Sequence, residues 1–256
     1  MTSKEIARKI MQAEINWYKH FANYENTDYG IVFYNTDDPT WTDYNHAHIL
    51  KYNKNSDFDA IITEIKNFYV KKDLRPMIYS AFERGQLEKI KDSLIKNGFT
   101  IEENYGGQTF LIHTSECKIN VPYTLNFKRI NNGEDLSFIY EVMPQDWKED
   151  VDDIIERRIK FPNYRLFAGY LDDVPVVIAD MEYFKGVVLI DDVGTSEKHR
   201  GKGYAREIIR FLVDYHYKNY KGSLLYLYYD NPVAGRIYRD AGFTEADIES
   251  WAAYIE

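Results

Sequence analysis

A short loop with two glycines carries the residues best suited to bind an anion. Gly201 and Gly203 lie where an apolar strand pattern is followed by an amphipathic helix pattern. Glycine has no Cβ atom between its N–H group and a ligand, and a helix N-terminus adds unsatisfied N–H groups and partial positive charge. In a chain of net charge −9, five basic or titratable side chains crowd this loop: Lys198, His199, Arg200, Lys202 and Arg206. The loop predicts a phosphate cradle, although an ordinary turn with a solvated basic face has the same composition.

The loop differs from two common nucleotide-binding motifs. It does not end in Gly-Lys-Ser/Thr, so it is not a Walker loop. Arg206 stands where the dinucleotide fingerprint G-x-G-x-x-G has its third glycine. A different class of phosphate-containing ligand is therefore expected.

Two motifs together resemble the GNAT superfamily of N-acetyltransferases. Arg200-Gly201-Lys202-Gly203-Tyr204-Ala205 fits Q/R-x-x-G-x-G/A, the superfamily's acyl-CoA pyrophosphate motif. The segment from Asn231 to Phe243 resembles its N-x-x-A-x-x-x-Y-x-x-x-G-F helix. The resemblance covers residues 125–256 and implies acetyl-CoA as cosubstrate, with no metal.

The resemblance also implies which residues contact acetyl-CoA. Backbone groups of Val193 and Thr195 would bind the pantetheine amides, and Asn231 would bind the pantetheine arm. Asn231 is also suited to cap the helix that begins at Pro232, and both roles can hold together. The pyrophosphate would be bound by a continuous run of residues: Arg200, Gly201, Lys202, Gly203, Tyr204, Ala205 and Arg206.

Three residues are candidates for the chemistry that the resemblance implies. Tyr238 would protonate the departing thiolate, although it could simply pack in the core beside Ile237. Asp191 and Asp192 lie on the strand before the loop, where the superfamily often places a base. Consecutive strand residues face opposite sides, so at most one of them is expected to face the acceptor, and the choice stays open.

The elements around these residues form an α+β pattern, which with the resemblance predicts a GNAT-like mixed central sheet flanked by helices. Short helices are expected at Glu134–Met143 and Val151–Ile159, and longer ones at Tyr204–Tyr217 and Pro232–Asp240. Strands are expected at Leu125–Ile130, Tyr164–Leu171, Pro175–Phe184, Val187–Val193, Ser223–Tyr229 and Trp251–Ile255.

The first half of the chain contains a faint echo of the second. Ile61, Ile62 and Ile65 lie 147 residues before a matching apolar set, and in both places a strand and a helix ending in Gly-Phe-Thr follow. The echo predicts two tandem GNAT-like halves, a degenerate N-terminal domain at residues 1–124 and an acetyl-CoA-binding domain at residues 125–256. In the first half Lys54 and Ser56 replace the loop glycines, so no pyrophosphate cradle is expected there.

Composition limits the remaining classes of function. Lys and Arg number 32 against 41 Asp and Glu, and this acidic balance disfavours binding to nucleic acid. No apolar run approaches the roughly 20 residues of a membrane span, and no apolar leader begins the chain. A lone cysteine, Cys117, fits a reducing cytoplasm. His46 and His48 share the spacing of strand ligands but lack a third partner, so no metal site is expected.

The sequence therefore predicts a cytoplasmic N-acetyltransferase that moves an acetyl group from acetyl-CoA to a primary amine of a small molecule or peptide. A non-catalytic CoA-binding regulatory or scaffold module is the alternative. Asp146, Trp147, Tyr183 and Phe184 are candidates to line an amine pocket. Assembly into a homo-oligomer is left open.

Overall fold

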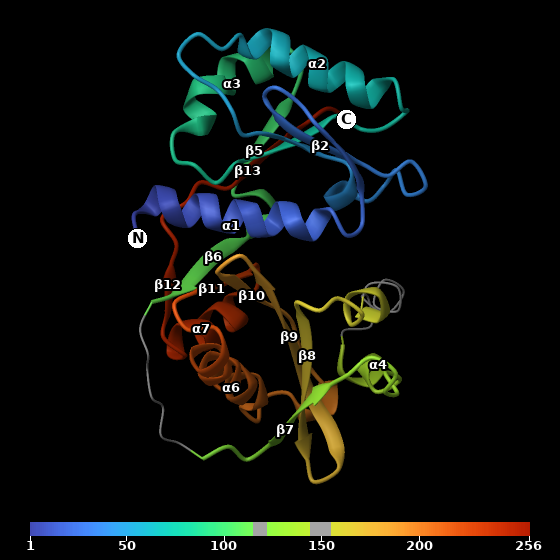
Figure 1. Ribbon diagram of the computed structural model, residues 1–256, viewed down its shortest axis with the longest axis vertical. Helices are drawn as coiled ribbons and strands as arrows, with labels where there is room; N and C mark the ends of the chain where they lie inside the picture. The colour runs from blue at the N-terminus through green and yellow to red at the C-terminus, as the bar shows by residue number, and fades with distance from the viewer. Residues whose placement is uncertain (115–121, 144–154) are drawn as a thin grey trace. The chain divides into compact units, whose positions relative to one another are not determined.

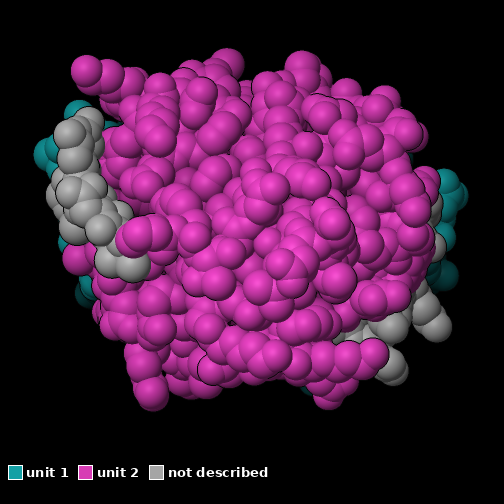
Figure 2. All heavy atoms as spheres, turned by 90° about the horizontal axis from the view of Figure 1, so that it is seen from below, with its two compact units in different colours: residues 1–109, 246–256 teal, residues 110–245 magenta. Residues whose placement is uncertain are grey.

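The computed structural model describes residues 1–114, 122–143 and 155–256 (Figure 1). The chain forms two compact units, one of residues 1–109 with 246–256 and the other of residues 110–245 (Figure 2). Cys117, Asp146 and Trp147 lie outside the described residues, as does part of the expected helix Val151–Ile159, of which residues 155–158 are helical.

The second unit is built on a seven-stranded mixed sheet. Its strands, in spatial order, are β12 (Phe243–Glu245), β6 (Thr109–His113), β11 (Leu224–Tyr229), β10 (Val187–Thr195), β9 (Val174–Phe184), β8 (Tyr164–Leu171) and β7 (Asn126–Ile130). Strands β10 and β11 are parallel, whereas β7 through β10 are antiparallel neighbours. The expected hairpin of β8 and β9 is confirmed, with Asp172 in its turn at φ 54°.

Helices cover both faces of this sheet. On one face α6 (Tyr204–Asn219) packs its apolar stripe, Ile208, Ile209, Leu212 and Val213, against β9 and β10. The helix α7 (Pro232–Asp240) belongs to the same core. On the other face α4 (Ile139–Val142) and Ile155 pack against Leu166, Ala168 and Ile178. Side chains along β8 and β9 alternate between the two faces of the sheet, so these strands contribute to two separate apolar cores.

The first unit has a six-stranded sheet and three helices. The strands, in spatial order, are β1 (Asn23–Asn26), β2 (Gly30–Tyr34), β3 (Ala47–Ile49), β4 (Met77–Tyr79), β13 (Trp251–Tyr254) and β5 (Thr100–Glu103). The helices are α1 (Ser3–Tyr18), α2 (Phe58–Val70) and α3 (Gln86–Lys96). Short 3₁₀ turns lie at Thr42–Tyr44, Tyr105–Gly107 and, in the second unit, Glu197–His199.

The two units repeat one arrangement of elements. The order β3–α2–β4–α3–β5 matches β10–α6–β11–α7–β12, and in both runs the first two strands pair in parallel. In each sheet a further strand lies between the second and third strands of the run, β13 in one and β6 in the other. The prediction of two tandem halves with one fold is confirmed at the level of topology.

The last strand is where the sequence prediction of the fold was wrong. Trp251–Ile255 was assigned to the C-terminal sheet, but β13 pairs with β4 and β5 in the first unit. Trp251 and Ala253 are buried there in the core of α2 and α3. Because β6 precedes residue 125 and β13 follows residue 245, each sequence half contributes a strand to the other unit's sheet.

None of the helices in the described residues is long and apolar enough to cross a bilayer.

Candidate active site

The parallel strands β10 and β11 separate beside the predicted loop. Their pairing covers only Val187–Leu189 and Leu224–Tyr226, so the second half of β10 has no ladder to β11. On its other side β10 carries a β-bulge between Asp191 and Gly194, with Asp192 at φ 49°. Val193 and Thr195 lie on this stretch, where their backbone groups on the β11 side are free of the ladder.

The N-terminus of α6 has the features of an anion site. Gly203, at φ 90°, is its N-cap, and no side chain caps the helix. A Cβ atom added at Gly201 or Gly203 would meet no atom within 4 Å. The first-turn N–H groups, which include those of Tyr204 and Ala205, are therefore open to a ligand.

The basic side chains of the loop differ in their surroundings. Arg200 and Lys202 are exposed, and Arg200 Nε donates to the Thr195 carbonyl oxygen at 3.3 Å. Arg206 instead forms a 3.0 Å ion pair with Asp240, with both side chains about half exposed. Because an exposed pair contributes little free energy, Arg206 can still exchange Asp240 for an anionic ligand.

The two adjacent aspartates lie near one buried arginine. Arg158, which is 2% exposed, donates from Nη1 to Asp192 Oδ2 at 2.9 Å, and its positive charge also acts on Asp191. The expectation of opposite faces for Asp191 and Asp192 rests on regular alternation along the strand. The bulge and the left-handed conformation of Asp192 break the alternation at this point.

Asp191 has the ionisation expected of a base at neutral pH. Burial of the carboxyl group and the negative charge of Asp192 together raise the pKa of Asp191 to about 7, against the opposing positive charge of Arg158. Near pH 7 this carboxyl can therefore both accept and release a proton.

Tyr238 has the ionisation expected of an acid. It lies on α7 and is 7% exposed. Burial raises the pKa of its hydroxyl well above the usual value, and the negative charges of Asp191 and Asp230 add to this. The residue packs in the core of the unit and also lies within electrostatic reach of Asp191, so the packing and acid roles are compatible.

Asn231 caps α7 as its sequence context suggests. Its Oδ1 accepts a hydrogen bond from Val233 N at 2.8 Å, and Pro232 occupies the first helical position. The cap uses the amide oxygen, so the side-chain NH₂ group can still donate to a ligand.

The corresponding place in the first unit is filled by the chain itself. Gln86, fully buried at the start of α3, donates from Nε2 to the Ile49 carbonyl and accepts from Ala81 N through Oε1, both at 2.7 Å. It thereby bridges the ends of β3 and β4. Asp57 caps α2 by accepting from Ala60 N at 3.0 Å, so a carboxylate occupies the helix N-terminus that is open in the second unit.

The sequence reasoning missed the residues that surround the aspartates. Arg158 Nη2 donates to Asp180 Oδ1 at 3.3 Å, and Tyr164 Oη donates to Asp180 Oδ2 at 2.8 Å. The available signal was Asp180 itself, an acid within the apolar strand Val174–Phe184, because a buried carboxyl requires partners. Nothing in the sequence identifies which cation that partner is.

The described candidates for an amine pocket lie further along the hairpin. Tyr183 pairs across the sheet with Val188 and stacks on Tyr220 at 5.1 Å, whereas Asp191 pairs with Asp180. Tyr183 and Phe184 therefore lie at the end of β9, opposite the start of β10 and before the point where β10 separates from β11.

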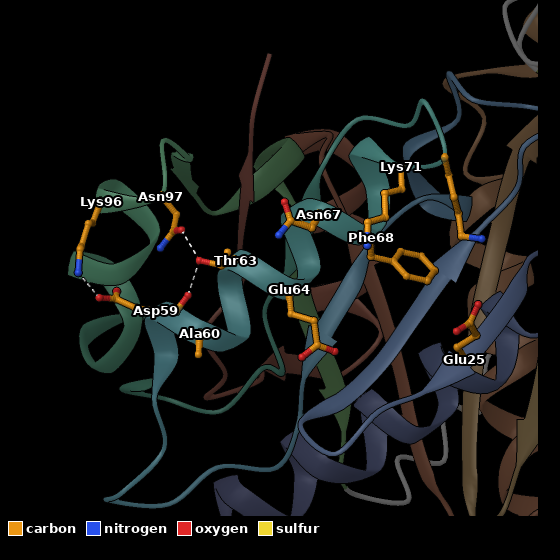
Figure 3. A pocket seen from close by; sticks show the side chains of 11 residues that line it. Glu25, Asp59, Ala60, Thr63, Glu64, Asn67, Phe68, Lys71, Lys96 and Asn97 are labelled. Carbon is orange, nitrogen blue, oxygen red and sulfur yellow. Dashed lines mark hydrogen bonds and ion pairs between the residues drawn. The ribbon is translucent and has the colours of Figure 1, made fainter.

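The first unit also has an open hollow of about 950 Å³ along α2 (Figure 3). At one end its polar side chains pair with one another: Lys96 with Asp59, and Thr63 with Asn97. At the other end Lys72 lies over the Phe68 ring. The described residues contain no group of three or more His, Cys, Asp or Glu side chains that could hold a metal ion.

His46 and His48 form a buried pair in the first unit. Their Nε2 atoms lie 3.0 Å apart, and the Nδ1 atoms face the carbonyl oxygens of Thr42 and Ser80. Burial lowers the pKa of His48 to about 4 and that of His46 well below its usual value. The pair is thus bound internally on both sides.

Comparison with known proteins gives a family match for part of the chain. Residues 134–243 match the model of the Acetyltransferase (GNAT) family. No curated protein sequence matches the chain significantly.

Solved structures with this fold cover most of the chain. A GCN5-related N-acetyltransferase from Kribbella flavida has a TM-score of 0.67 at 16% identity, covering 98% of this chain and 95% of its own. A functionally unknown conserved protein from Staphylococcus epidermidis has a TM-score of 0.63 at 12% identity, covering 92% and 94%. A tandem GNAT protein from the clavulanic acid biosynthesis pathway has a TM-score of 0.59 at 11% identity, covering 81% and 74%. Residues 134–243 therefore match the GNAT-family model, and the fold of these solved structures extends over nearly the whole chain.

Proposed function

We propose that this protein is an N-acetyltransferase that moves an acetyl group from acetyl-CoA to a primary amine of a small molecule or peptide. The observation that carries the proposal is that Asp191, on β10, lies within electrostatic reach of Tyr238, on α7. Burial raises the pKa of Asp191 to about 7 and keeps the Tyr238 hydroxyl protonated at neutral pH. One group can thus accept a proton and the other can donate one.

The second unit has backbone and side-chain groups that fit acetyl-CoA. The uncapped α6 N-terminus at Gly203, with Arg200 and Lys202 beside it, suits a pyrophosphate. The stretch of β10 at Val193 and Thr195, which has no ladder to β11, suits the amides of the pantetheine arm, as does the NH₂ group of Asn231. When bound, acetyl-CoA supplies an acetyl group activated as a thioester.

Two proton transfers are assigned to this chain's residues. Asp191 takes a proton from the acceptor nitrogen, directly or through one water, so that the nitrogen lone pair can form the amide bond. Tyr238 gives its proton to the sulfur as the carbon–sulfur bond breaks, and the second proton that the nitrogen loses as the amide forms restores the Tyr238 hydroxyl, so the products are an amide and a thiol. Asp191 and Asp192 also make the local potential favourable for an acceptor that arrives as an ammonium ion.

A screen of amines tests the proposal. Purified protein, saturating acetyl-CoA and a panel of polyamines, aminoglycosides, amino acids and peptides are assayed for thiol release. We expect release with at least one amine and a large loss in Asp191→Asn, whose side chain has nearly the same shape but cannot act as the base. Acetyl-CoA binding without thiol release from any amine would instead support the CoA-binding module.

A further inference from the structure

Arg158 connects two strands behind the candidate base. Its guanidinium is 2% exposed and pairs with Asp180 on β9 and with Asp192 on β10. Its Cζ atom also lies 4.6 Å from the centre of the Tyr164 ring on β8. These contacts hold the side chain of Asp192 at the bulge, where the backbone is in the left-handed region at φ 49°.

The charged groups around Asp191 come from every neighbouring element. On its own strand the neighbour is Asp192, and β9 contributes Asp180 and Glu182. The helical turn at residues 155–158 contributes Arg158, and α7 contributes Tyr238. Tyr164 on β8 donates to Asp180. Among these described groups the carboxyls outnumber the cations, so the position of the Arg158 charge decides which carboxyls ionise.

We propose that Arg158 and Asp192 are positioning residues, whose partly buried ion pair holds the bulge and sets the ionisation of Asp191. This inference rests on the proposed function in assigning Asp191 as the base. It gives the two adjacent aspartates different tasks, because Asp192 is occupied by Arg158 whereas Asp191 remains available to the acceptor.

The two members of the pair act on Asp191 in opposite directions. The positive charge of Arg158 stabilises the Asp191 carboxylate and so lowers its pKa, whereas the negative charge of Asp192 raises it. Charges within about 4–6 Å in a buried site shift a pKa by about 1–3 units. Removing each charge in turn should therefore move the titration of Asp191 to opposite sides of the parent value.

The experiment follows the Asp191 carboxyl directly by ¹³C NMR titration of the free protein, with Asp191→Asn used to assign the signal. We expect a midpoint near pH 7 in the parent. In Arg158→Gln the midpoint should rise by about one pH unit or more, and in Asp192→Asn it should fall by a similar amount. Arg158→Lys keeps the charge, so its shift should be smaller than that of Arg158→Gln.

Two features keep the test decisive. Arg157→Gln removes the same charge from the exposed neighbouring position and should leave the midpoint near that of the parent. Should Arg158→Gln fail to fold, Asp192→Asn still decides, because asparagine has nearly the same shape and tolerates a positive φ. An Asp191 midpoint that does not fall in Asp192→Asn would overturn the proposal.

The pH dependence of turnover then separates this inference from the proposed function. With an accepted amine, kcat/KM should rise through the Asp191 midpoint, and in Asp192→Asn this rise should move to lower pH whatever the change in the plateau value of kcat/KM. Full loss of turnover in Asp192→Asn would mean that Asp192 is the base, and would contradict its positioning role. Carboxyl shifts as expected in a protein that turns over no amine would contradict only the proposed function.

Discussion

At the scale of single residues, Asp191 and Tyr238 affect one another's protons. The negative charge of Asp191 contributes to the raised pKa of the Tyr238 hydroxyl. Once Asp191 has accepted a proton that charge is gone, and the phenol becomes a stronger acid. The pair therefore favours proton uptake from the acceptor before proton donation to the leaving group.

Replacing Tyr238 with phenylalanine tests the acid. Tyr238→Phe keeps the ring that packs in the core but removes the proton, so acetyl-CoA affinity should change little. The rate of the chemical step should fall by about 10²–10⁴-fold, the usual contribution of a positioned acid. Single-turnover rates at saturating acetyl-CoA measure this step. A rate within about twofold of the parent would mean that Tyr238 only packs.

The residues that could be predicted are those with a local signal. The capping role of Asn231 and the glycines of the loop follow from spacing along one stretch of chain. Arg158 could not be found in this way, because its partners on β9 and β10 lie 22 and 34 residues further along the chain. The bulge at Asp192 likewise depends on pairing with β9, which the alternation rule does not contain.

At the scale of elements, the two equivalent helices differ at their first residues. The α6 helix begins at Gly203 with no side-chain cap, whereas α2 begins with the Asp57 carboxylate bonded to Ala60 N. A carboxylate at a helix N-terminus satisfies the same N–H groups and dipole that a phosphate would use. The duplicated helix therefore leaves its anion site open in only one of these two copies.

Gly203→Val tests the uncapped N-terminus of α6 as the anion site. Its side chain would extend from the N-cap toward the space a phosphate would fill, so we expect acetyl-CoA affinity to fall by about tenfold or more, or about 1.4 kcal/mol. Calorimetry measures the affinity. A valine at φ 90° also strains the backbone, so Gly186→Val, in the β9–β10 turn at φ 85° with similar open space, is the matched control. Equal affinity in both folded variants would place the anion elsewhere.

The number of acetyl-CoA molecules bound per chain tests whether the equivalent place in the first unit also binds the ligand. We expect one, because in the first unit Gln86 bridges the strand ends at Ile49 and Ala81 and Asp57 caps the helix. A calorimetric titration of the parent gives the stoichiometry, and Gly203→Val should weaken that single binding event. Two binding events per chain would show that the first unit also accepts the ligand.

At the scale of the whole molecule, the sequence predicts the repeated order of helices and strands better than it predicts which strands belong to which sheet. The helices α6 and α7 and the hairpin of β8 and β9 follow from local periodicity and turn residues, and the structure confirms them. Strands β6 and β13 are five and four residues long and mostly apolar, so either sheet could bury them. Their placement is decided by long-range pairing, which no local pattern contains.

The placement of β6 leads to a prediction about fragments. A fragment of residues 125–256 lacks β6, which lies between β11 and β12 in the sheet. It also loses His113, whose Nε2 and Nδ1 lie 3.0 Å from the Ala241 carbonyl oxygen and 2.8 Å from Tyr217 Oη. A fragment of residues 110–245 keeps all seven strands of the sheet apart from Thr109.

We therefore expect the two fragments to behave differently although their lengths are similar. Residues 110–245 should unfold cooperatively in a thermal scan, because the core around Leu111 and Phe243 stays complete. Residues 125–256 should show a broad, weakly cooperative transition, since β12 loses its partner strand and β13 is without β4 and β5. Circular dichroism and calorimetry of both fragments make the comparison. A sharp transition for residues 125–256 at or above the temperature of residues 110–245 would mean that the C-terminal half closes its sheet without β6.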